Sequence, residues 1–356
     1  TFGNSGRFIG SYTTTLQGAP NRASNSNFDT KAYTLENIVT YSKRFNELHQ
    51  VDATFMQSIQ QQSMESSVTE SEGMPSENML WHDLSAGQIR SFDSNQEQWS
   101  ILSYMARLNY TLMDRYLVTL TARRDGSSRF GEERKYGFFP SLALGWRIIE
   151  EGFMQNITAI TDLKVRASFG SIGNTAIDPY QSMGSLVRQP YLFGSEPALG
   201  FEPNTLPNPD LKWESSTTAN LGIDFGMLNN RLTGSLEIYQ INTKDLLLSQ
   251  ALPTSTGYDR ILTNIGSTRN TGFEMSLSTV NLDLPSGFKW TSNLNFGINE
   301  NEIVELYGDD RDDVGNRWFI GEPINVYYDL VFDGIWQEDE ADIAEDYGRL
   351  PGHIKV

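Results

Sequence analysis

Residues 99–112 read WSILSYMARLNYTL, and apolar and polar side chains alternate strictly along this stretch. A period of two is the signature of a β-strand whose two faces meet different surroundings. The stretch therefore predicts a strand with one apolar and one polar face. The apolar face would carry Leu102, Tyr104, Ala106, Leu108, Tyr110 and Leu112, and the polar face Ser103, Met105, Arg107, Asn109 and Thr111.

The same alternation recurs along the rest of the chain, and helical periodicity is almost absent. We count about twelve candidate strands by this criterion, which predicts an all-β, antiparallel fold. The clearest further runs lie within residues 116–123, 141–148, 163–170, 217–225, 232–238, 273–277 and 290–298.

Short and long links alternate between these runs. In a meander of antiparallel strands, successive links emerge at opposite ends of the sheet. The alternation therefore places the short turns at one end and the long loops at the other, as in an outer-membrane β-barrel. The short links are 44–47, 113–114, 228–230 and 282–286, with 150–160 intermediate, and the long links are roughly 17–32, 61–97, 125–137, 173–212, 246–264 and 301–325.

A transmembrane β-barrel would turn the apolar faces to lipid and the polar faces inward. The expected lipid-facing residues are Leu102, Leu108, Leu120, Leu144, Leu221 and Phe296, and the expected inward residues are Arg107, Asn109, Arg123, Lys164 and Arg166. Loop parity predicts a periplasmic location for Asn46, Asp114, Asn229 and Pro285 and an external one for Glu77, Ser195, Ser255 and Asp312.

Composition excludes several other classes of protein. The chain has 356 residues and a formal net charge of −18, which argues against nucleic acid as a partner. No run approaches the roughly 18 to 20 apolar residues that a membrane-spanning helix needs. Cysteine is absent, so neither a disulfide framework nor a thiolate metal site can form.

Five blocks of sequence make the chain resemble a known family. Residues 115–148 read RYLVTLTARRDGSSRFGEERKYGFFPSLALGWRI, residues 162–174 DLKVRASFGSIGN, residues 208–214 NPDLKWE, residues 264–273 NIGSTRNTGF and residues 332–337 FDGIWQ. In this order, the blocks closely resemble the SusC/RagA-like TonB-dependent transporters of the Bacteroidota outer membrane.

The resemblance implies a plugged barrel of 22 strands, of which about 11 to 12 would lie in this chain. Residues 1–356 are thus expected to be a partial TonB-dependent receptor β-barrel, with the plug domain, the N-terminal extension and the C-terminal barrel strands absent from it. The implied function is active import of a large nutrient, a glycan or an oligopeptide. The implied partners are TonB, a SusD-like surface lipoprotein, the protein's own plug domain and outer-membrane lipid, and no cofactor is implied.

Candidate contact residues follow from these positions. Arg107, Asn109, Arg123, Lys164 and Arg166 on the polar faces would touch either the plug or the solute. Among the loop candidates, Arg124, Asp125 and Arg129, with Arg123, surround the DGSSRFG turn and would bind a polar substrate or form a rim of charge pairs. Trp81 and Trp318 would stack on sugar rings or peptide side chains, or anchor the packing of their loops.

Two acidic clusters raise the question of a metal site. Neither has the complete alternate spacing of an EF-hand loop, so both are expected to be solvated loop segments. With three His and no GxSxG or HExxH pattern, we expect no catalytic site and no metal site. The clusters comprise Asp309, Asp310, Asp312 and Asp313, and Glu338, Asp339, Glu340, Asp342, Glu345 and Asp346.

Three alternatives stay open at this point. A passive porin or adhesin barrel would share the strands but lack a plug, and a secreted β-rich binding module would be soluble without detergent. Residues 326–337 form either one more barrel strand or a hairpin within a large outer loop.

Overall fold

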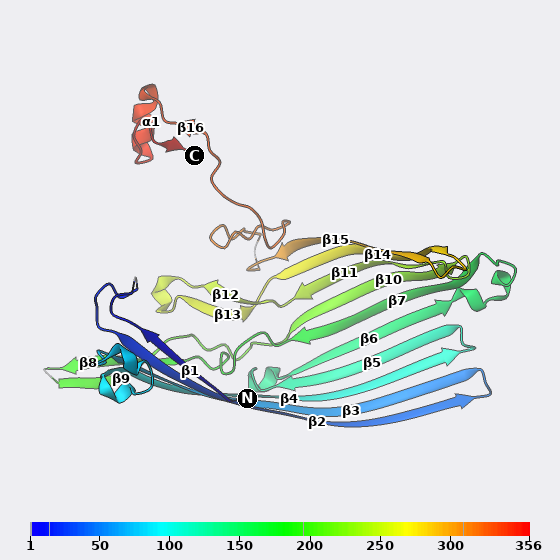
Figure 1. Ribbon diagram of the computed structural model, residues 1–356, viewed down its shortest axis with the longest axis horizontal. Coiled ribbons are helices and arrows are strands. Elements are labelled where there is room, and N and C mark those ends of the chain that lie inside the picture. The colour runs from blue at the N-terminus through cyan, green and yellow to red at the C-terminus, as the bar shows by residue number, and fades with distance from the viewer. Residues whose placement is uncertain (1, 14, 195, 309) are drawn as a thin grey trace.

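The computed structural model describes residues 2–13, 15–194, 196–308 and 310–356, and over these residues one antiparallel sheet of eleven strands dominates the fold (Figure 1). The strands pair in chain order, so the sheet is a meander. Its members are β1 (Phe2–Ile9), β2 (Arg22–Phe45), β3 (His49–Glu72), β4 (Gln88–Leu112), β5 (Tyr116–Ser127), β6 (Tyr136–Arg147), β7 (Ile160–Asn174), β10 (Glu214–Met227), β11 (Leu232–Lys244), β14 (Ser267–Asp283) and β15 (Lys289–Glu305).

Smaller elements lie in the links and after β15. Three two-stranded sheets comprise β8 (Leu186–Phe193) with β9 (Glu196–Pro203), β12 (Leu247–Ala251) with β13 (Arg260–Asn264), and β16 (Gly334–Ile335) with β17 (Ile354–Lys355). The helices are α1 (Ala341–Asp346) and the 3-10 turns Glu77–Met79, Leu84–Ala86, Glu132–Arg134, Ile148–Glu150, Gly152–Met154, Thr254–Thr256 and Glu338–Glu340. Within the described ranges, no helix is long and apolar enough to cross a bilayer.

The predicted alternation of link lengths is confirmed. Four short links lie at one end of the sheet, and the links with the β8–β9 and β12–β13 hairpins lie at the opposite end (Figure 1). The one exception in length is link 148–159 at the first end, which is longer than link 128–135 at the second. We call these two ends the short-link end and the long-link end. The short-link end holds residues 46–48, 113–115, 148–159, 228–231 and 284–288, and the long-link end holds residues 10–21, 73–87, 128–135, 175–213 and 245–266.

The boundaries predicted for the first long links were wrong. β2 starts at Arg22 and β3 continues to Glu72, so most of 17–32 and much of 61–97 are regular strand. Segments such as QQQSMESSVTESE (60–72) are polar on both faces, so the period of two is absent although backbone pairing continues. Because these residues lie beyond the apolar part of the strands, both of their faces meet water.

Residues 326–337 do not add a strand to the large sheet. Residues 326–333 have no regular structure, and Gly334–Ile335 pair with Ile354–Lys355 in a separate hairpin. The described part of the chain therefore contributes eleven strands to the sheet, the lower end of the predicted range.

The strand register separates two faces as predicted. Paired residues on neighbouring antiparallel strands share a face, and Leu108 pairs with Leu120, which pairs with Leu142. This apolar face also carries Leu102, Leu144, Leu221 and Phe296, because each lies at the matching parity of its strand. Its side chains are open to the surroundings, with Leu120 47% and Phe296 52% exposed, which suits contact with lipid.

Aromatic side chains border the apolar face at the short-link end. Tyr116 of β5 pairs with Trp146 of β6, and both donate hydrogen bonds to the Glu151 carboxylate, at 2.6 Å from the Tyr116 hydroxyl and 3.0 Å from the Trp146 indole. These hydrogen bonds hold the pKa of Glu151 below its usual range. The pair agrees with the aromatic girdle expected where a barrel meets the lipid–water interface.

Candidate functional site

All five inward candidates lie on the polar face of the sheet. Arg107 pairs with Thr121 and Asn109 with Thr119, and Arg123 lies two residues further along β5. Lys164 and Arg166 lie an even number of residues from Gly170 on β7, so they share its face. Gly170 pairs with Ser141, which pairs with Thr121, so this is the same polar face. A polar wall therefore extends from β4 to β7, as the alternation predicted.

A cavity of about 780 Å³ opens on this wall. Arg123 lies in it beside Asp125, with the guanidinium Nε 2.8 Å from both carboxylate oxygens, and its Nη2 donates to the Ser103 hydroxyl at 3.1 Å. Because Asp125 compensates the charge of Arg123, the cavity carries little net charge, and it presents hydroxyl and amide groups beside apolar side chains such as Phe139 and Trp213. The hydroxyl and amide groups come from Ser103, Thr121, Ser141, Ser168, Asn174 and Thr218.

Arg166 is the centre of a second polar cluster, on β7, β10 and β11. Its guanidinium donates two hydrogen bonds of 2.8 Å to Asp224 and one of 2.5 Å to Glu237, and Asn220 donates to the other oxygen of Glu237 at 3.1 Å. Two carboxylates thus surround one guanidinium, all three about one third exposed. The cluster itself carries one excess negative charge, which a cation on a facing surface would neutralise.

The remaining inward candidates make weaker contacts. Arg107 donates from Nε to the Thr121 hydroxyl at 3.3 Å, and Asn109 accepts from the Thr119 hydroxyl at 2.9 Å. Lys164 pairs across the sheet with Asp224 and Arg147. These side chains line the polar wall without forming a closed network.

The residues expected together at the DGSSRFG turn are instead separated. Arg124 and Asp125 both belong to β5, where alternation turns Asp125 to the polar face and Arg124 to the apolar face. The Arg124 guanidinium lies 4.5 Å from the centre of the Tyr136 ring. The prediction that Arg124 is a loop residue was therefore wrong, because the strand continues through it to Ser127.

Arg129 lies in the link between β5 and β6 and joins neighbouring segments. Its guanidinium stacks 4.8 Å from the centre of the Trp99 ring and donates from Nη1 to the Thr175 carbonyl at 3.0 Å. Its Nε is buried and has no hydrogen-bond partner among the described residues. These contacts support a structural role for Arg129 at the long-link end.

The two loop tryptophans are both held by local packing. The ring of Trp81 covers Gly6 of β1 so closely that a Cβ there would lie 2.0 Å from the indole. Trp318 exchanges two backbone hydrogen bonds of 2.9 Å with Asp313 and is half-buried. Both observations favour the loop-anchoring role of these side chains.

Sequence reasoning missed a buried cluster at the long-link end, which we call the rim hub: Phe130, Ile177, Leu211 and Trp213. Leu211 is fully buried and Phe130 is 1% exposed. The centre of the Trp213 ring lies 5.6 Å from that of Phe130, and its indole donates to the Lys135 carbonyl at 2.8 Å. The hub thus joins the link 128–135 to the link 175–213.

Two asparagines attach a third link to the rim hub. Asn208 donates to the Leu262 carbonyl at 2.8 Å, and Asn264 donates to the carbonyls of Lys212 and Asp245 at 2.8 and 2.9 Å. The blocks DGSSRFG, NPDLKWE and NIGSTRNTGF therefore meet in space. The hub residues Phe130 and Leu211 lie in links, outside the alternating runs, and this apolar character in otherwise polar links was the signal that could have indicated their role.

The first acidic cluster is used to shape its own loop. Asp312 accepts from the Ile320 amide at 2.8 Å, and Asp313 accepts from Tyr307 and Asn316. Burial and the hydrogen bond to Asp313 raise the pKa of Tyr307 to about 12. Burial of Asp313 opposes its ionisation, but the hydrogen bonds from Tyr307 and Asn316 hold its pKa below the usual range.

In the second acidic cluster, Glu340 accepts from Lys355 at 2.9 Å and caps the backbone of Gln337. Asp309 lies outside the described residues. Among those described, no group of three or more potential ligands could hold a metal ion.

Comparisons with known proteins agree with this geometry. The family model of the TonB dependent receptor-like β-barrel matches residues 1–335. TonB-dependent receptor P26 of Formosa agariphila is 36% identical over 334 residues, which is 91% of this chain and 34% of that protein. TonB-dependent receptor SusC of Bacteroides thetaiotaomicron is 41% identical over 221 residues, 60% of this chain and 22% of SusC.

Solved structures show the same fold. The RagAB peptide transporter matches with a TM-score of 0.79 at 25% identity, covering 86% of this chain and 34% of that one. The RagAB peptide importer in its "closed-closed" state covers 99% of this chain and 39% of its own, with a TM-score of 0.83 at 23% identity. The chain thus spans about a third of the length of the relatives it matches.

Proposed function

This chain belongs to the TonB-dependent receptor-like β-barrel family, and on this basis we propose that it forms part of the wall of an active importer for a large nutrient. The chain lies in the bacterial outer membrane, as its SusC and RagAB relatives do. One observation carries the proposal: the ten strands from β2 to β15 keep one polar and one apolar face in register. A barrel wall with lipid outside and a polar interior needs this arrangement.

The polar wall would face a plug domain and the solute path. The excess negative charge around Arg166 suits a cationic side chain of the plug, while the neutral cavity beside Arg123 suits a polar, uncharged part of the solute. Arg107, Asn109 and Lys164 extend the same surface. Energy for import would reach the plug through TonB, as the name of the family implies.

A SusD-like lipoprotein would cover the long-link end. The β8–β9 hairpin supports this role, because one of its faces is apolar and unusually exposed, with Leu186 69%, Leu192 74%, Leu199 58% and Phe201 60% open. An isolated hairpin is marginally stable in water, and an exposed apolar patch commonly marks an interface. The links 73–87 and 175–213 and the segment 306–325 after β15 would together form the docking rim.

The solute would be a glycan or an oligopeptide. RagAB is described as a peptide transporter, which supports an oligopeptide, while a glycan is what the family resemblance implies as the alternative.

Uptake in cells tests the active-import proposal. Cells that produce the full-length protein should accumulate a fluorescent oligosaccharide or oligopeptide, and deletion of TonB should abolish this accumulation. A strain lacking only this protein serves as the matched control. Uptake that depends on the protein but persists without TonB would identify a passive porin instead.

Copurification tests the lid. In the full-length protein, replacing residues 186–203 by two glycines should release the SusD-like lipoprotein after gentle solubilisation, while the barrel keeps its heat-modifiable migration. The paired changes Leu192→Asp and Leu199→Asp should have the same effect with the hairpin intact. Full retention of the lipoprotein in both variants would exclude the hairpin as its docking site.

A further inference from the structure

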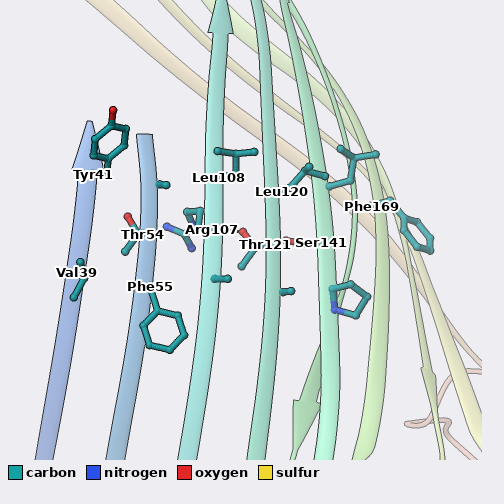
Figure 2. A pocket seen from close by; sticks show the side chains of 15 residues that line it. Val39, Tyr41, Thr54, Phe55, Arg107, Leu108, Leu120, Thr121, Ser141 and Phe169 are labelled. Carbon is teal, nitrogen blue, oxygen red and sulfur yellow. Dashed lines mark hydrogen bonds between the residues drawn. The ribbon is translucent and has the colours of Figure 1, made fainter. Parts of the chain in front are cut away.

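The apolar face contains a hollow of about 750 Å³ over β2 to β7 (Figure 2). Its floor follows one row of small side chains, in which Ala106 pairs with Ala122 and Ala122 with Pro140. Larger side chains border the row, and Figure 2 shows Phe55, Leu108, Leu120 and Phe169 around it. We call this hollow the acyl groove.

A cation lies beside the acyl groove on its long-link side. Arg124 follows Ala122 by two residues on the same face of β5, in the direction of the long-link end. It is exposed, and within the described part of the chain it makes no ion pair with a carboxylate. Its guanidinium rests on the Tyr136 ring at 4.5 Å, which fixes the charge at the edge of the apolar face.

Polar groups continue the level of Arg124 across the sheet. Arg124 pairs with Tyr104, Tyr104 with Gln57, and Gln57 with Asn37. Amide and phenol groups thus replace the alanines and leucines of the rows nearer the short-link end. In outer-membrane barrels the long loops are external, so Arg124 lies on the external side of the groove. The next row outward still carries Leu102, and Phe138 pairs with Arg124 on β6, so Arg124 lies just inside the external border of the apolar face.

We propose that the acyl groove and Arg124 together bind one phosphate-bearing lipid of the membrane. The lipid would lay an acyl chain over Ala106, Ala122 and Pro140, and its phosphate would accept hydrogen bonds from Arg124. A guanidinium matches the geometry of a phosphate and binds it through two parallel hydrogen bonds. The positive charge of Arg124 beside an apolar groove favours an anionic amphiphile over a second copy of this chain.

Lys43 provides a matched control for Arg124. It lies on the same apolar face, at the opposite, short-link end, and its ammonium rests 4.8 Å from the centre of the Phe45 ring. It is likewise a cation on an aromatic ring at the edge of the apolar face, and it lies two residues beyond Tyr41, which lines the groove on its short-link side.

Native mass spectrometry of the full-length protein in detergent tests the site. The probes are dioleoyl phosphatidic acid, dioleoylglycerol, which lacks the phosphate, and inorganic phosphate alone. We expect one bound phosphatidic acid, with affinity at least about tenfold above that for dioleoylglycerol, which corresponds to roughly 1.4 kcal/mol, and no retained inorganic phosphate. Arg124→Gln should remove this preference, whereas Lys43→Gln should leave it unchanged.

A second variant tests the groove itself. Ala122→Phe keeps Arg124 but fills the floor, and we expect it to weaken phosphatidic acid binding at least as much as Arg124→Gln does. Equal binding of both lipids to the unchanged protein, or full retention by Arg124→Gln, would overturn the proposal. If Ala122→Phe instead separated a dimer into monomers without changing lipid binding, the groove would belong to a contact between copies. None of these outcomes depends on import activity.

Discussion

An arginine at Leu120 gives the most direct test of the two faces. Leu120 lies on the apolar face four residues from Tyr116 and four from Arg124, which border that face on β5. At about 3.4 Å per residue it is about 14 Å along the strand from either border. A strand tilt of about 40° reduces this to about 10 Å along the membrane normal, which places Leu120 near the middle of an apolar band about 25 Å tall.

Leu120→Arg should therefore destabilise the folded barrel in a bilayer, lowering its free energy of unfolding by roughly 2 to 4 kcal/mol. This corresponds to about a 30- to 700-fold change in the folding equilibrium constant. The measurement is a urea titration of the full-length protein in phosphocholine vesicles. The folded fraction is read on an electrophoresis gel, where an unheated folded barrel migrates differently from the heated, unfolded chain. Thr119→Arg is the control, because Thr119 is the neighbouring residue on the polar face. If Leu120→Arg were neutral and Thr119→Arg disrupted folding, the assignment of the faces would be reversed.

Three further outcomes are expected. Single cysteines at Glu77 and Ser255 on the long links should react with a membrane-impermeant thiol reagent on intact cells, while cysteines at Asp114 and Asn229 should react only after lysis. The opposite pattern would invert the topology. Ser195 is also expected outside but lies beyond the described residues. Leu211→Ala should destabilise the rim hub by about 2 to 5 kcal/mol, seen as faster hydrogen exchange in residues 204–213, whereas Leu199→Ala on the exposed hairpin face should change it by less than about 0.5 kcal/mol. Because the pKa of Asp313 is lowered, the hydrogen bonds from Tyr307 and Asn316 to its carboxylate should stabilise the loop 306–320 above about pH 4, and this stabilisation should be lost as the pH falls below that value. The measurement is the fluorine signal of 5-fluorotryptophan at Trp318, which should shift in this pH range in the unchanged protein and not in Asp313→Asn.

The two faces of the sheet were predictable from the sequence because one meets lipid and the other a polar interior, and each environment selects its own kind of side chain. Along β4 to β7 every second side chain meets lipid and the others a polar interior, so the sequence itself carries a period of two. The parity of Arg107, Arg123 and Arg166 followed from this pattern. The parity of Arg124 did too, but its strand was expected to end too early.

Features governed by contacts distant in sequence were not predictable in the same way. β2, β3 and β4 continue beyond the apolar face, where water on both sides removes the hydrophobic alternation. The rim hub depends on three links meeting, and no local property of Phe130, Leu211 or Asn264 states which other segment it contacts. The partners of Arg166 likewise come from β10 and β11, 58 and 71 residues away.

The rim hub also divides the long links into segments that can be exchanged and segments that cannot. Ile177, before the β8–β9 hairpin, and Leu211, after it, pack in one cluster with Phe130. Both ends of the hairpin are therefore held near the same point on the scaffold, whatever residues the hairpin contains. A hairpin grafted from a relative between residues 185 and 204 would therefore inherit its position without any change to the strands. Such proteins can therefore diversify by exchange of whole hairpins between fixed flanking residues, because the change in folding free energy stays within the exchanged hairpin.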